Sequence, residues 1–143
     1  MKKLGSVLGA GAIVAVLAGT SVAGPRVSAS GSLSMAGASS KLAAIPPAWG
    51  TKVVLDATYK GVKRTDTPRV QIICMQDGSV VYGDSAVLKD SPATVDFTLG
   101  IPGDGSGTSV WTSGGASCRS DLFYTSPNGS YTLLADVEFD ATA

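Results

Sequence analysis

The strongest constraint on the fold of this chain is the alternation of apolar and polar residues from residue 52 onward. Val53, Leu55 and Ala57 share one face of an extended segment, with Asp56 and Thr58 on the other. No segment of this region has the three-to-four-residue spacing of an amphipathic helix, and Gly, Pro and Asp interrupt it at short intervals. We expect short strands at 52–60, 69–76, 79–83, 94–99, 116–125 and 131–142, with a further strand around 110–112.

The N-terminal segment has the layout of a bacterial-type secretory signal. Lys2 and Lys3 precede an uncharged, mostly apolar run at 4–22, and small residues allow cleavage after Ala23 or Ala29. The run is also just long enough to span a bilayer, so retention of the leader as a membrane anchor is the alternative. Its several glycines favour the cleaved signal. We therefore expect a secreted, extracellular chain.

A spacer follows the leader. The segment at 30–44 is almost wholly Ser, Gly and Ala and has no strand or helix period, which is typical of a flexible linker. The stiff step Ile45-Pro46-Pro47 ends it. The expected organisation is a signal peptide at 1–29, a spacer at 30–44 and one folded domain at 45–143.

The charge balance excludes one class of partner. The whole chain has 11 basic and 11 acidic residues, and loss of the leader removes Lys2, Lys3 and Arg26. The remaining chain is weakly acidic and has no run of Lys or Arg. Nucleic-acid binding depends on neutralising phosphates, so we expect no nucleic-acid partner.

The two cysteines, Cys74 and Cys118, are predicted to form a disulfide. An exported chain reaches an oxidising compartment, where a pair of cysteines normally oxidises. The bond would close a loop of about 45 residues and stabilise the fold by roughly 3–4 kcal/mol. A pair of buried free thiols is the alternative.

A chain with roughly six or seven short strands and one disulfide resembles an immunoglobulin-like or fibronectin-III-like antiparallel sandwich. The resemblance covers 45–143 and concerns architecture alone. Met75 and Gln76 follow Cys74 where an antibody-type domain has a Trp soon after its first cysteine, and Tyr124 lies too late for a tyrosine corner. The two cysteines can therefore join neighbouring strands, or a strand and a loop. The fold transfers no function.

The composition removes most catalytic mechanisms. The chain contains no histidine, so it lacks the commonest general base and metal ligand. Oxidised cysteines supply neither a thiolate nucleophile nor a zinc site. Gly83-Asp84-Ser85 looks like an esterase nucleophile block, but nothing activates Ser85, and a turn is the expected structure there. We expect no enzyme, no catalytic residue and no cofactor.

Acidic residues gather near the C-terminus. Asp136, Glu138 and Asp140 alternate on one face of the last expected strand, and Asp121 lies on the strand before it. A solvated strand face is the simplest interpretation. Asp121, Asp136 and Glu138 are also weak candidates for calcium ligands, because calcium accepts oxygen ligands at flexible geometry. A carbohydrate- or calcium-binding module is therefore the alternative function.

The hairpin around Asp77-Gly78 has two apolar faces. A two-residue turn there would place Cys74 opposite Val81 and Met75 opposite Val80. One face then belongs to the core. The other is predicted to be a protein-binding patch, because contiguous exposed apolar area usually marks a contact surface. Its residues are Ile73, Met75, Val80 and Tyr82.

Alternatively, another segment of the same chain could cover this second apolar face of the hairpin. Trp49, Trp111 or the segment 45–47 could fold over it. If the patch is open, the chain acts by surface contact as an envelope, extracellular or virion-surface accessory protein. The partner would be a protein or cell surface, including a second copy, with no membrane contact after cleavage.

The last hairpin contains a conflict of register. A type I turn at 126–129 would place Cys118 opposite Glu138, whereas the apolar pattern places Cys118 opposite Phe139 and Arg119 opposite Glu138. We follow the apolar pattern, because a one-residue slip exposes a whole apolar row. Either a shorter turn or a bulge must then correct the phase.

Overall fold

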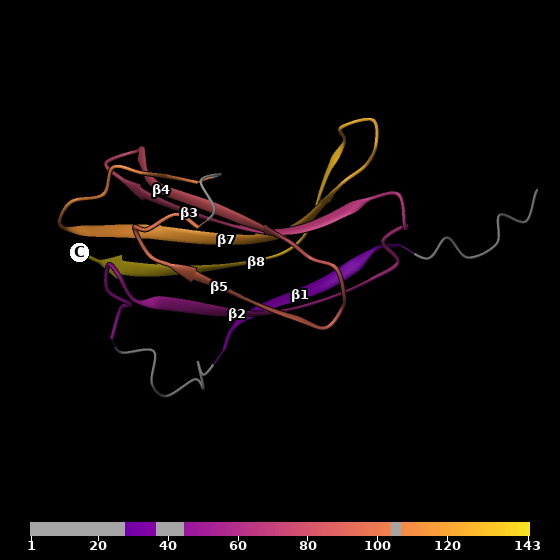
Figure 1. Cartoon of the computed structure of the whole chain (residues 1–143), viewed down its shortest axis with the longest axis horizontal. Coiled ribbons are helices and arrows are strands. Elements are labelled where there is room, and N and C mark those ends of the chain that lie inside the picture. Colours follow the sequence, from indigo (N-terminus) through magenta and orange to yellow (C-terminus); the bar gives the residue numbers. More distant parts are fainter. Residues whose placement is uncertain (1–27, 37–44, 104–106) are drawn as a thin grey trace, which may run out of the picture.

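The computed structural model describes residues 28–36, 45–103 and 107–143, and every regular element in these ranges is a strand. The strands form two antiparallel sheets that face each other as the layers of a sandwich (Figure 1). The predicted all-β class is confirmed. The smaller sheet has the order β1 (Ser30–Met35), β2 (Lys52–Lys60), β5 (Ala93–Thr98), and the larger has the order β6 (Thr108–Ser109), β4 (Ser79–Val87), β3 (Thr67–Gln76), β7 (Gly115–Thr125), β8 (Tyr131–Thr142).

The core lies between the two sheets and follows the alternation seen in the sequence. Every second residue of β2 and β3 is buried, as side chains on successive residues of a strand point to opposite faces. The polar residues between them face solvent. The fully buried apolar side chains include Leu55 and Ala57 of β2, Val70, Ile72 and Cys74 of β3, Tyr82 of β4, Leu99 after β5, and Leu122 of β7.

The first strand is a correction to the predicted spacer. Ser30–Met35, expected to be flexible, pairs along its whole length with β2, and Leu33 and Met35 pack against the core. The strand also lies close to the larger sheet at Gly31. A Cβ there would lie 2.9 Å from Leu122 Cδ2 and 3.1 Å from Leu134 Cβ, so the close approach requires glycine. The small residues of this segment indicated a linker, but the glycine at position 31 is what allows the strand to pack close to the larger sheet.

Two further expectations fall partly outside the described residues. The leader at 1–27, with cleavage after Ala23, and the spacer part at 37–44 both lie there. Ala29, the second expected cleavage position, is described and lies against Gly61. Across the described ranges, we find no helix with the length and apolar character needed to cross a membrane.

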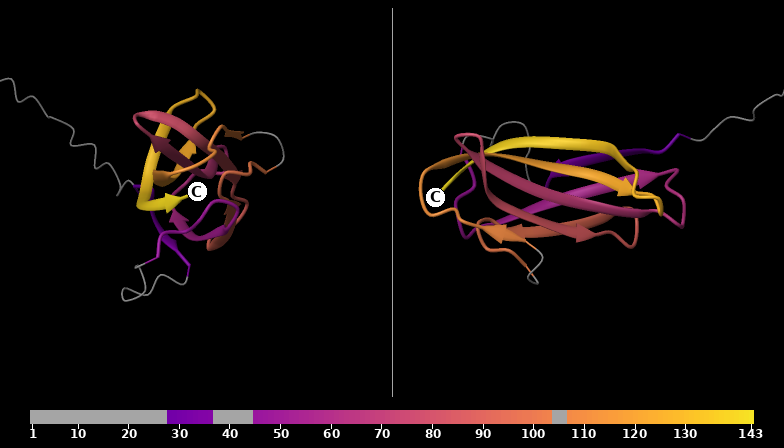
Figure 2. Two further views of the ribbon diagram at one scale, coloured as in Figure 1. Left: turned by 90° about the vertical axis from the view of Figure 1, so that its left-hand side faces the viewer. Right: turned by 90° about the horizontal axis from the view of Figure 1, so that it is seen from above.

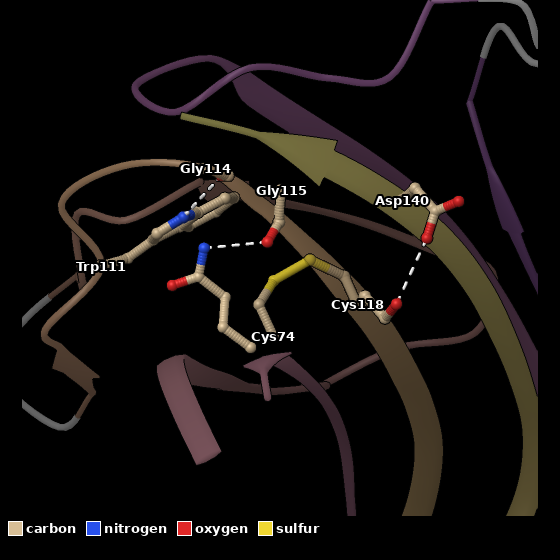
Figure 3. Close-up of a disulfide and its surroundings, with 8 residues drawn as sticks. Cys74, Trp111, Gly114, Gly115, Cys118 and Asp140 are labelled. Carbon is tan, nitrogen blue, oxygen red and sulfur yellow. Dashed lines mark hydrogen bonds between the residues drawn. A yellow bond between two sulfur atoms is a disulfide. The ribbon is translucent and has the colours of Figure 1, made fainter. Parts of the chain in front are cut away.

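Two strands depart most from their predicted bounds, and the others differ by two residues or fewer at either end. The strand expected to end at Gly83 continues to Val87, so Asp84 and Ser85 lie in β4 and not in a turn. The strand expected around 110–112 is the short β6 at Thr108–Ser109. It precedes Trp111, which is buried near the disulfide and donates its Nε1 hydrogen to the carbonyl of Gly114 at 3.2 Å (Figure 3).

The predicted disulfide joins Cys74 and Cys118, with a Cα–Cα distance of 4.0 Å. The two residues are direct partners on β3 and β7, which are neighbours in the larger sheet. Both side chains are buried on its core face. The bond therefore braces one sheet and does not link the two layers, which was one of the arrangements left open by the sequence.

The register of the last hairpin agrees with the apolar pattern. Cys118 pairs with Phe139 and Arg119 pairs with Glu138. The turn itself is the longer one, with Gly129 at φ 85° and its N–H donating to the carbonyl of Ser126. A β-bulge next to Leu122 corrects the phase, as one of the two predicted solutions required.

Candidate functional site

The β3–β4 hairpin turns as predicted but carries an unexpected bulge. Asp77 and Gly78 both have positive φ, at 48° and 79°, which a type I′ turn requires. Met75 pairs with Val80 as expected. Beyond that pair the register shifts, so Cys74 pairs with Tyr82 and not with Val81.

This bulge divides the predicted patch. Met75 and Val80 lie on the outer face, 41% and 49% exposed, and Ile73 beside them is half-buried. Tyr82 is fully buried in the core, so its predicted place on the outer face is wrong. A bulge re-aims side chains, and here the adjacent Val81 and Tyr82 are both buried. We call Ile73, Met75 and Val80 the open apolar patch.

The described residues proposed as cover for this patch lie elsewhere. Trp49 packs against Gly100, and Trp111 lies near the disulfide on the core side. Ile45 is 86% exposed and covers nothing in the described structure. The patch is therefore open with respect to the described parts of the chain.

A charged network lies at the centre of the same face. Asp121, only 8% exposed, accepts hydrogen bonds from Arg119 Nε at 2.6 Å and Gln71 Nε2 at 3.0 Å. Arg119 also approaches Asp136, with Nη2 3.9 Å from Oδ2. The hydrogen bond to Asp121 and its charge raise the pKa of Arg119. The nearly buried carboxylate of Asp121 is tolerated because each of its two oxygens accepts a hydrogen bond.

This network bears directly on the predicted calcium ligands. Asp121 and Asp136 pair across β7 and β8, and Glu138 pairs with Arg119. The guanidinium of Arg119 thus lies near both Asp121 and Asp136, where its positive charge disfavours a bound cation. No group of three metal-ligating side chains is found within the described residues.

An aromatic cluster, missed from the sequence, lies at the far end of this face. Phe123 and Tyr131 stack with ring centroids 4.6 Å apart, and Leu133 is 40% exposed beside its partner Phe123. Burial raises the pKa of Tyr131, and the charge of Asp121 raises it further. The bulge in β8 places Leu133 opposite Phe123. No local pattern in the sequence indicates that bulge position.

A shallow depression of about 440 Å³ lies between the open apolar patch and the acidic strand β8. Met75 forms one side, and the charged residues of β7 and β8 form the other. Ser117, one of its lining residues, donates a hydrogen bond to Asp140 Oδ1 at 3.3 Å, and Figure 3 marks this bond at Asp140. The depression is lined by Met75, Ser117, Cys118, Arg119, Glu138, Phe139 and Asp140.

The outer face of the larger sheet combines apolar and charged side chains. The chain has no histidine, and the backbone N–H of Ser85 donates to Asp84 Oδ1 at 2.8 Å. The face offers apolar side chains, ion pairs and a shallow surface, which are features of interfaces. Compared with known proteins, the chain matches no family model, no curated protein and no solved structure.

Proposed function

We propose that this chain is a secreted, non-enzymatic, immunoglobulin-like sandwich that acts by surface contact. The strand order supports the fold type. In constant-type immunoglobulin domains the first, second, fourth and fifth strands share one sheet, and the third and the last two share the other. Here β1, β2 and β5 form one sheet, and β3, β7 and β8 lie in the other. β4 pairs with β3, as the added strand of variable-type domains does.

Export is supported by the N-terminal sequence and the disulfide together. The charged and apolar pattern at 1–29 is typical of a secretory leader, and the cysteines are paired in a bond that persists in oxidising compartments. No free cysteine exists among the described residues. These features are those expected of an extracellular protein.

The observation that carries the contact proposal is the exposure of the open apolar patch. Met75 and Val80 are paired neighbours on a rigid hairpin, and each leaves two fifths or more of its surface in solvent. Beside them lies the depression that ends at the carboxylates of β8. A rim of charges around exposed apolar side chains is typical of protein–protein interfaces. The partner is a protein surface, and a second copy is the first to test.

The acidic last strand does not favour the carbohydrate- or calcium-binding alternative. Arg119 lies between Asp121 and Asp136 and neutralises the most buried carboxylate. Asp140 is engaged by Ser117. These acids act as partners of this chain's own side chains.

The proposal is tested by comparing the self-association of the wild type with that of Val80→Asp. Sedimentation velocity over a range of protein concentrations measures the dissociation constant of each. Loss of one buried Val contact is worth about 1.5–3 kcal/mol, so the dissociation constant should rise roughly 10- to 100-fold. Val87→Asp is the matched control, because Val87 is 51% exposed on the same strand but away from the turn. Equal weakening by both variants, or no effect of Val80→Asp, would refute the contact role of the patch. A wild-type chain that stays monomeric throughout the range would exclude self-association.

A further inference from the structure

Basic residues that are spread through the sequence gather at one end of the sandwich. Lys60, Lys63 and Arg64 lie at the end of β2 and in the connection to β3, and Lys89 lies after β4. We call these four residues the basic end. All four are exposed, and none forms an ion pair with another described residue. Asp66 and Asp90 are the acidic residues of the same two connections.

The two connections form one surface. Tyr59 N–H donates to Ser91 Oγ at 2.7 Å, and Leu88 N–H donates to the carbonyl of Pro68 at 2.9 Å. Between them lies a hollow of about 450 Å³. Its lining mixes cationic side chains with apolar ones: Tyr59, Val62, Lys63, Arg64, Asp66, Thr67, Pro68, Val87, Leu88 and Lys89.

The chain enters the folded domain at this same end. Ser28 and Ala29 lie against Gly61, in the connection that carries Lys63 and Arg64. Figure 2 shows the start of β1 and this connection together at one end of the molecule. In the sequence, the apolar run at 4–22 precedes Ser28 by only a few residues.

Apart from Arg69 on β3, the other basic residues of the described surface are paired with acids. The acids of β8 lie on the open face of the larger sheet, and Arg119 there is already paired with Asp121. At the opposite end, Lys52 is paired with Asp96. An anionic surface would thus attract one end of this domain and repel its acidic face, which sets an orientation.

We propose that the basic end docks on an anionic lipid bilayer. Lys and Arg near a bilayer are attracted to its phosphates. The apolar Val62 and Val87 line the same hollow as these cations, and such a mixture of apolar and cationic side chains suits the headgroup region. Ser28 and Ala29 lie against Gly61 beside these cations, so an apolar leader inserted in a bilayer would hold this end near it. Docking in this pose leaves the open apolar patch free.

This proposal rests on the proposed export but not on the contact role of the patch. It departs from the sequence-based expectation that a cleaved chain has no membrane contact. Charges separated by more than twenty positions in the sequence come together only in the tertiary structure. A soluble polyanion is the competing ligand of the same charge, and the test must separate the two.

Vesicle binding of the full chain tests the proposal. The probe is vesicles of phosphatidylglycerol and phosphatidylcholine in equal parts, compared with phosphatidylcholine alone. Because an apolar leader enters either vesicle, the readout is the ratio of the two partition coefficients. The triple variant Lys63→Gln, Arg64→Gln, Lys89→Gln should lower this ratio roughly 100-fold, at about fivefold per cation. Added NaCl should lower the wild-type ratio, because salt screens exposed charges.

The control variant lowers the net charge by the same amount as the triple variant, but at the end of the sandwich opposite to the basic end. Lys52→Gln with Ser79→Asp and Ser113→Asp replaces exposed residues there and should leave the ratio within about threefold of wild type. A wild-type ratio near one, or equal losses in both triple variants, would overturn the proposal. Tighter binding to soluble polyphosphate than to vesicles of equal charge would assign the site to a polyanion instead. Val80→Asp should keep the wild-type ratio, so failure of the patch and failure of the basic end are distinguishable.

Discussion

Truncation of Tyr82 tests the bulged register of the β3–β4 hairpin. Tyr82 is 0% exposed and pairs with Cys74, whereas Val80, two residues before it, is 49% exposed. An unbulged hairpin would place both side chains on the outer face. The two registers therefore predict very different losses of stability on truncation to alanine.

The expected magnitudes follow from burial. Removing a fully buried aromatic side chain costs about 3–5 kcal/mol, from lost apolar contact and the cavity that remains. Tyr82→Ala should therefore lower the urea midpoint by about 2–3 M if the m-value is near 1.5 kcal/mol/M. Val80→Ala should cost less than about 1 kcal/mol, because half of its surface is already in water.

Tyr82→Phe separates the ring from the hydroxyl. The hydroxyl is buried and has no hydrogen-bond partner within the described residues. Removing a buried donor that lacks a partner should leave the free energy of unfolding unchanged or raise it by up to about 1 kcal/mol. Burial, followed by the charge of the nearby Asp84, raises the pKa of Tyr82.

The assay is equilibrium unfolding in urea, followed by tryptophan fluorescence. Trp111 is 3% exposed in the folded chain and should report global unfolding. A loss below about 1 kcal/mol for Tyr82→Ala, or equal losses for Val80→Ala and Tyr82→Ala, would show that the bulged register is wrong.

Two further predictions concern the disulfide and the first strand. Cys74→Ala with Cys118→Ala should lower the unfolding free energy by about 3–4 kcal/mol, since the bond spans a sequence separation of 44; dithiothreitol should destabilise the wild type in urea melts but leave the double variant unchanged. Gly31→Ala should cost about 1–3 kcal/mol, because its Cβ would lie 2.8 Å from the carbonyl oxygen of Thr58. Gly83→Ala, where the nearest atom is 3.8 Å away, is the matched control, and equal effects in thermal melts would argue against the packing of β1.

Much of the fold was predictable because strand formation leaves a local signal. Alternation identified β2, β3, β7 and β8, and Asp77-Gly78 identified the turn between β3 and β4. The register of β7 with β8 was also predictable, since an apolar row must stay buried. The acids of β8 could be placed on one face for the same reason.

The candidate site was less predictable because bulges leave no comparable local signal. One extra residue on β4 moved Tyr82 into the core, and one on β8 brought Leu133 opposite Phe123. Each bulge is stabilised by packing between segments that are distant in the sequence. Composition also misled at Ser30–Met35, where small residues fit a narrow space that only the second sheet creates.

By itself, the sequence determined that this chain forms antiparallel strands, pairs its two cysteines and lacks imidazole chemistry. These properties depend on residue types and on neighbours within a few positions. Only the tertiary structure decided that β1 completes the smaller sheet, which apolar side chains remain exposed, and that Lys63 and Lys89 share one end. The physical reason is that exposure and charge proximity depend on which distant segments pack together.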